Sequence, residues 1–122
     1  IISNNAPAPI GPYSQAIVAG NLLFVSGQVA IVPATGNLNN PDILTETTQV
    51  MENIKAILTE AGTDFSHIVK TTIFLKDMQD FAAVNTIYGS YLSEPFPARE
   101  TVQVAALPKN AHVEISVTAL LG

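Results

Sequence analysis

The stretch TETTQVMENIKAILTEAG, residues 45–62, carries the clearest structural signal in this sequence. Its apolar side chains recur at the spacing of one helix face: Val50, Ile54, Ile57, Leu58 and Ala61. This spacing predicts an amphipathic helix over residues 45–61. Asp42 can cap its first turn, and Gly62 stands where a C-terminal capping glycine belongs. The next stretch, IVKTTIFL at residues 68–75, is rich in β-branched and aromatic residues, which is typical of a strand.

The flanking segments predict the remaining elements. Upstream, residues 16–19 and 22–25 are two short apolar runs separated by Gly20-Asn21, a hairpin signal. Downstream, an apolar stripe predicts a second helix from about residue 80 to 92, which Pro95 stops. Strands are expected over residues 101–105 and 113–121. The order β-β-α-β-α-β-β predicts one α+β domain over residues 1–122, a mixed sheet with both helices on one face.

Composition and charge exclude several classes of protein. The 122 residues include no cysteine, so a disulfide scaffold and a thiolate nucleophile are excluded. The net charge is −5 and the five cations are scattered, which disfavours nucleic acid and anionic membrane surfaces as partners. No apolar run is long enough to span a bilayer, and no signal peptide is recognisable. A cytoplasmic location is therefore expected.

Low charge and a half-covered sheet favour self-association. Charged residues make up 12% of the chain, against a typical value of about 25%. If both helices lie on one face of the sheet, the other face is uncovered in a monomer and is the natural interface between identical copies. A surface rich in Ser, Thr, Asn and Gln is the alternative explanation, and strand alternation does not decide between the two.

Few residues offer catalytic chemistry. His67 and His112 are the only histidines, so no metal site is expected. Arg99 is the only arginine, and its planar guanidinium could bind a carboxylate with two hydrogen bonds or form an internal salt bridge. Glu114 alternates with Val113 and Ile115 along a predicted strand. It is either a half-exposed edge residue or a placed acid or base.

Two hydroxyl residues stand beside glycines. Tyr13 lies within Gly11-Pro12-Tyr13, and Ser26 precedes Gly27. Glycine lets a ligand or another backbone approach closely. Each hydroxyl residue could therefore line a binding site, but a turn or packing role is the alternative for both.

Several motifs occur in order along nearly the whole chain. They are GPYSQA at residues 11–16, FVSGQ at 24–28, PAR at 97–99, LPK at 107–109 and VEI at 113–115. Asp42-Ile43, Asn53-Ile54-Lys55 and Val84-Asn85 lie between them. With these motifs the chain resembles the RidA family, also called YjgF or L-PSP endoribonuclease.

The resemblance implies a chorismate-mutase-like fold assembled as a homotrimer, with the three sheets forming an inner barrel and a cleft between each pair of subunits. It also implies hydrolysis of reactive enamine and imine intermediates, such as 2-aminoacrylate/2-iminopropanoate and 2-iminobutanoate, to 2-oxo acids and ammonia without a cofactor. By resemblance, Arg99 would bind the substrate carboxylate and Glu114 would orient or activate water. The cleft would be lined by Tyr13, Ser26, Gly27 and Thr101, and Asn85 would help to fix the site.

Two residues depart from the family pattern. Glu100 follows Arg99 where a small or apolar residue is usual; strand alternation should point it away from the site, but a bend would let it pair with Arg99. Thr101 stands where many members have cysteine, and we expect it to be tolerated. Two other functions remain open: a regulatory module that binds 2-oxo acids without turnover, and the ribonuclease or translation inhibitor of the older family name.

Overall fold

The computed structural model describes residues 1–122 and contains the elements expected from the sequence, with shifted ends. The strands are β1 (Ala16–Ala19), β2 (Leu22–Gln28), β3 (Ile68–Leu75), β4 (Ala98–Gln103) and β5 (Val113–Leu120). The helices are α1 (Ile43–Glu60) and α2 (Phe81–Ser90). Short 3₁₀ turns lie at Phe65–His67, Met78–Asp80 and Pro108–Asn110.

Both ends of α1 are capped as expected. The Asp42 carboxylate accepts a hydrogen bond from the Thr45 backbone N–H at 2.7 Å, so the helix begins at Ile43 rather than Thr45. At the other end Gly62 has a φ of +81°, a left-handed conformation that L side chains rarely adopt. The expected helix was therefore correct in kind and slightly misplaced at each end.

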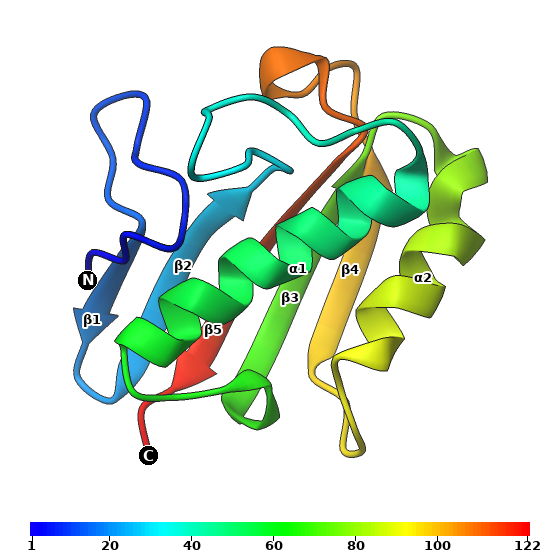
Figure 1. The fold of residues 1–122 in the computed structure, drawn as a ribbon. Helices are drawn as coiled ribbons and strands as arrows, with labels where there is room; N and C mark the ends of the chain where they lie inside the picture. Colours follow the sequence, from blue (N-terminus) through cyan, green and yellow to red (C-terminus); the bar gives the residue numbers. More distant parts are fainter.

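The sheet order is β1-β2-β5-β3-β4, so the C-terminal strand lies in its centre (Figure 1). All neighbouring strands are antiparallel except β3 and β4, which are parallel and are joined through α2. This crossover brings α2 onto the same face as α1 (Figure 1). The α+β architecture with two helices on one face is confirmed, and β4 forms one edge of the sheet.

The core lies between the helices and the sheet. Side chains of α1 and the inward-facing residues of the strands are fully buried there, among them Ile54, Ile57, Leu23, Ile73 and Ile115. Each large aliphatic side chain buried in this way contributes about 1.5–3 kcal/mol. The core therefore fixes which face of every strand points inward, and with it the direction of the polar residues between.

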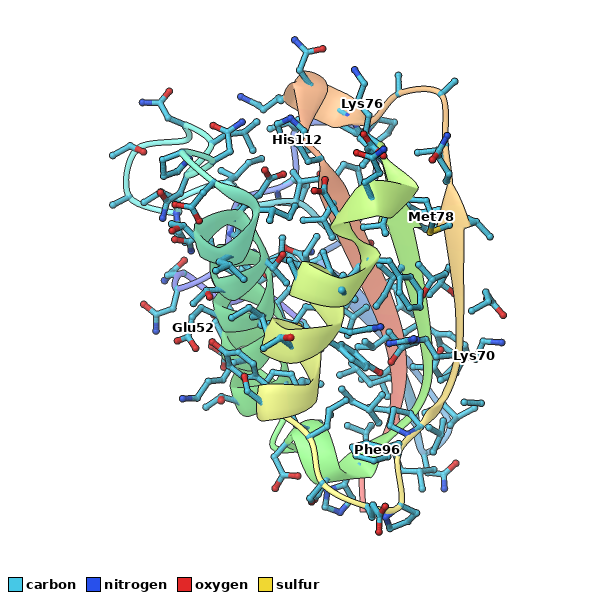
Figure 2. The ribbon with its side chains drawn as sticks, turned by 90° about the vertical axis from the view of Figure 1, so that its right-hand side faces the viewer. Glu52, Lys70, Lys76, Met78, Phe96 and His112 are labelled. Atoms are coloured by element: carbon cyan, nitrogen blue, oxygen red, sulfur yellow. The ribbon has the colours of Figure 1, made fainter.

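The opposite face of the sheet is open. Lys70 extends from it on the side away from the helices (Figure 2), where its Nζ lies 2.7 Å from Glu100 Oε1. Ile17 and Phe24, which are paired across the β1–β2 hairpin, are both about half exposed on this face. The face thus mixes polar and apolar residues. No helix of the chain combines the length and apolar content that crossing a lipid bilayer requires.

Candidate functional site

Arg99 lies within β4, not ahead of it as the sequence suggested, because β4 begins at Ala98. Arg99 pairs in register with the buried Thr71 of β3, which places it on the face covered by the helices. Its Nη1 donates a hydrogen bond to Asn85 Oδ1 of α2 at 2.7 Å. The edge strand and α2 therefore hold the guanidinium between them.

Two aromatic rings of α2 support the same guanidinium. Its Cζ lies 5.3 Å from the ring centre of Tyr88 and 5.6 Å from that of Phe81. Phe81, Asn85 and Tyr88 follow helical spacing, so they share one face of α2. The Tyr88 hydroxyl donates to Thr71 Oγ1 at 2.9 Å, which ties this ring to β3. Burial raises the pKa of Tyr88 despite the opposing effects of Thr71 and Arg99.

Arg99 has no acidic partner within the chain. The ion pairs join other residues, and Glu100 binds Lys70 and Thr72 on the open face. These hydrogen bonds lower the pKa of Glu100. The expectation that alternation turns Glu100 away from Arg99 is confirmed, and the internal salt bridge considered for Arg99 is absent.

The guanidinium borders a cavity of about 330 Å³, lined by Asn85, Tyr88, Gly89, Phe96, Pro97 and Arg99. Thr101, two residues beyond Arg99, pairs with the buried Ile73 and so lies on the same face of β4. Its Oγ1 is buried without a hydrogen-bond partner. A cation with free N–H groups beside an apolar wall can bind a small anion that carries an apolar group.

The other expected site residues gather elsewhere. Tyr13, Ser26, Gly27 and Glu114 line a second cavity of about 340 Å³, together with Ile10, Val29, Ile31 and Pro108. Glu114 is half-buried, and burial raises the pKa of its carboxyl group. A carboxyl group in this setting is suited to proton transfer.

Local backbone geometry explains why Gly27 stands beside Glu114. The β2–β5 register shifts between Val25 and Gln28, so β2 bulges there. A Cβ on Gly27 would lie 2.8 Å from Glu114 Cδ, and only glycine lets the carboxyl group rest against the bulge. What approaches this glycine most closely within the chain is therefore the Glu114 side chain.

The segment that carries Tyr13 is tied to the same bulge. The Ser26 backbone N–H donates to the Gln15 carbonyl at 2.9 Å, and the Ser26 hydroxyl donates to the Ser14 carbonyl. The buried Gln15 side chain also bonds the backbone of Ser3 in both directions. Ser26 thus has the backbone-bracing role that the sequence left open, while it also lines the cavity.

The two cavities lie on different faces of the sheet. Arg99 aligns with Thr71 and Val117, which are buried under the helices, whereas Glu114 alternates with the fully buried Val113 and Ile115. Glu114 therefore faces away from the helices and from Arg99. A single chain brings Arg99 together with Asn85, and Glu114 together with Tyr13, Ser26 and Gly27, but it does not join the two sets.

Sequence reasoning missed Phe81, Tyr88 and Gly89 as site residues. Phe81 and Tyr88 belong to the apolar stripe that predicts the second helix, and the signal that could have found them is Asn85, placed between them at helical spacing. The histidines lie at the surface, each beside a carboxylate: His67 with Asp64 and His112 with Glu46. No group of three or more His, Asp or Glu side chains is arranged to hold a metal ion.

Known proteins match this chain over almost its whole length. The family model described as Endoribonuclease L-PSP matches residues 3–121. The chain is 49% identical over 121 residues to the chloroplastic Reactive Intermediate Deaminase A of Arabidopsis thaliana, covering 99% of this chain and 65% of that protein. It is 46% identical over 122 residues to the 2-iminobutanoate/2-iminopropanoate deaminase of Capra hircus, covering 100% and 89%. The crystal structure of RidA from an Antarctic Psychrobacter superposes with a TM-score of 0.94 at 44% identity, covering 98% and 97%.

Proposed function

The chain belongs to the endoribonuclease L-PSP family, also called RidA or YjgF, which includes reactive intermediate deaminases, and we propose that it hydrolyses small 2-imino acids. The substrates would be 2-aminoacrylate/2-iminopropanoate and 2-iminobutanoate, and the products 2-oxo acids and ammonia. The observation that carries this proposal is Arg99, a guanidinium without an acidic partner at the edge of a cavity.

Arg99 suits the carboxylate of such a substrate. Asn85 occupies one of its N–H groups, and the rings of Tyr88 and Phe81 support the plane. The remaining N–H groups can bind both oxygens of a carboxylate. Because the supports are neutral, they orient the guanidinium without competing with the substrate for its charge.

Glu114 suits the water chemistry. In the proposed reaction a water oxygen attacks the imine carbon and forms a C–O bond, and Glu114 accepts a proton from that water. The same proton then passes to the imine nitrogen, which gives a carbinolamine. The hydroxyl proton of the carbinolamine next passes through Glu114 to the amine, the C–N bond breaks, a carbonyl forms and ammonia leaves. No electrons are exchanged with a second reactant, so no redox cofactor is needed. Tyr13 and Ser26 would line the path of the water.

A second copy of the chain would complete the site. Because Arg99 and Glu114 face opposite sides of the sheet, one chain cannot direct both at one small molecule. We place the cleft between subunits of a homotrimer, with Arg99, Asn85 and Thr101 from one subunit and Glu114 with its neighbours from the next. The open sheet face, with the exposed Ile17 and Phe24, would lie inside this assembly. Sedimentation should then give three times 12.9 kDa, about 39 kDa.

A coupled assay tests the reaction. A threonine dehydratase supplies 2-iminobutanoate, and its decay is followed with and without this protein. We expect the wild type to accelerate decay and Arg99→Ala to be inactive, whereas Lys55→Ala, on the exposed side of α1, should retain full activity. Unchanged imine decay together with measurable 2-oxobutanoate binding would instead identify a regulatory binding module.

Mixing two inactive variants tests the shared cleft. Arg99→Ala and Glu114→Gln chains are co-expressed with different tags and purified as mixed assemblies. If each cleft takes Arg99 from one subunit and Glu114 from the next, every mixed trimer has one cleft in three with both wild-type residues, so the purified mixed assemblies should recover about a third of wild-type activity. If both residues act within one chain, mixing restores nothing.

The endoribonuclease function in the family description has less support here. The net charge is −5, and one of the five cations, Lys70, is paired with Glu100. Such a surface offers little attraction to a phosphate backbone. RNA that is incubated with the protein should stay intact. An Arg99→Ala preparation purified in parallel controls for contaminating nuclease.

A further inference from the structure

Gly89 occupies a helical position that the chain itself does not require to be glycine. It is the ninth residue of α2, and its φ lies outside the left-handed region. A Cβ built on Gly89 would meet no atom within 4 Å. Glycine is among the poorest helix formers and alanine the best, so this residue weakens α2 without a steric reason inside the chain.

The empty space beside Gly89 belongs to the Arg99 cavity. Gly89 lies one helical turn beyond Asn85, which holds the guanidinium, and both residues line the cavity. Phe96 and Pro97, from the loop between α2 and β4, also line it. Phe96 is 57% exposed and lies close to the end of α2 (Figure 2). The lining of the cavity thus combines the charged Arg99 with the apolar Phe96 and the open position at Gly89.

We propose that Gly89 sets the size of the substrate side chain by leaving room for an aliphatic group next to Phe96. This inference rests on the proposed function, because it assumes that Arg99 binds the carboxylate. With that end fixed, the substituent on the imine carbon extends along the apolar wall. The cavity of about 330 Å³ is at the lower end for small-molecule sites, which suits a metabolite with a short aliphatic chain.

Stable 2-oxo acids test the inference without turnover. Dissociation constants of pyruvate and 4-methyl-2-oxopentanoate are measured by calorimetry for the wild type, Gly89→Ala, Gly89→Leu and Ser90→Leu. Ser90 is exposed, follows Gly89 on α2 and does not line the cavity, so it is the matched control. Melting temperature and sedimentation are recorded for each variant.

We expect Gly89→Leu to raise the dissociation constant of 4-methyl-2-oxopentanoate at least about tenfold and to leave that of pyruvate within about twofold of wild type. The loss of a space the size of one methylene group already costs about tenfold or more in affinity. Gly89→Ala should raise the melting temperature by about 4 °C, because alanine is a better helix former than glycine. It should weaken the binding of 4-methyl-2-oxopentanoate less than Gly89→Leu does. Ser90→Leu should change neither dissociation constant.

The outcomes that would overturn the inference are distinct. If Gly89→Leu binds both acids like the wild type, the side chain does not extend toward Gly89, and the proposed function still stands. If Gly89→Leu weakens the binding of both acids equally, the space beside Gly89 serves the carboxylate instead. If the variant dissociates the assembly, the space is filled by a neighbouring subunit. If the wild type binds neither acid, the proposed function fails and this inference fails with it.

Discussion

Replacing Arg99 with lysine tests whether the proposed anion site needs the planar guanidinium or only a positive charge. Lysine keeps one positive charge but has no planar fork, so it can present only a point charge to a carboxylate. In the native chain Nη1 donates a hydrogen bond to Asn85 Oδ1 at 2.7 Å, and Cζ lies 5.3 Å and 5.6 Å from two ring centres. The planar fork can make both contacts and still present further N–H groups to a carboxylate.

The magnitude follows from what the fork provides. One of two charge-assisted hydrogen bonds to the substrate is lost, worth about 1.5–3 kcal/mol. Stacking on the rings contributes about 0.5–1 kcal/mol at an exposed site. A total of about 2–4 kcal/mol in transition-state binding corresponds to roughly 30- to 1,000-fold in kcat/KM.

The assay is imine decay in the dehydratase-coupled reaction, with 2-oxobutanoate binding measured in parallel. Lys55→Arg is the matched exchange, because Lys55 is exposed on α1 and forms no ion pair. We expect Arg99→Lys to lose binding and kcat/KM together and Lys55→Arg to lose neither. An Arg99→Lys variant whose kcat/KM and 2-oxobutanoate affinity stay within about twofold of wild type would show that a planar fork is not what binds the substrate.

Further outcomes follow from the same geometry. Glu114→Gln should keep 2-oxo acid binding but slow turnover. Because burial raises the pKa of Glu114, the wild-type rate should fall as the pH is lowered, with a midpoint above the ordinary value of 4.5. The rate of the variant should not show this acid-side fall in a pH profile. Gly27→Ala brings a Cβ within 2.8 Å of Glu114 Cδ, the end of a flexible side chain that can shift, so turnover should fall while urea denaturation shows little loss of stability; unchanged turnover would show that the carboxyl group does not act from its place against Gly27. Asn85→Asp keeps the hydrogen bond to Arg99 but adds a competing carboxylate, so calorimetry should detect at least about tenfold weaker 2-oxo acid binding, and unchanged affinity would contradict an anion site.

Local signals were sufficient to predict α1 and insufficient to place β4. The α1 periodicity, the Asp42 cap and Gly62 all act within one segment, so sequence alone locates that helix to within a turn. β4 was expected at residues 101–105, but it runs from Ala98 to Gln103. Its start is set by pairing with Lys70 of β3, a contact between distant segments that no local propensity of Ala98 or Glu100 encodes.

The same limit applies to the candidate site. Alternation along one strand correctly separated Glu114 from Val113 and Glu100 from Arg99. It could not relate Arg99 to Glu114, because β4 and β5 are not neighbours and their relative facing is transmitted through Thr71 of β3. The motifs therefore named the residues of both cavities, while the sheet order determined that one chain holds them apart.

The groups that contact Arg99 are all neutral, and this is what suits the residue to the proposed chemistry. An arginine that serves structure is usually paired with a carboxylate, which would occupy the fork that a substrate needs. Here an amide and two aromatic rings hold the guanidinium instead, and the nearest acid in sequence, Glu100, is drawn to Lys70 on the other face. Strand alternation along β4 keeps that acid away from Arg99. The positive charge therefore remains available to an incoming anion, and in the proposed trimer the same separation of faces would leave Glu114 to act on a molecule held by a neighbouring copy.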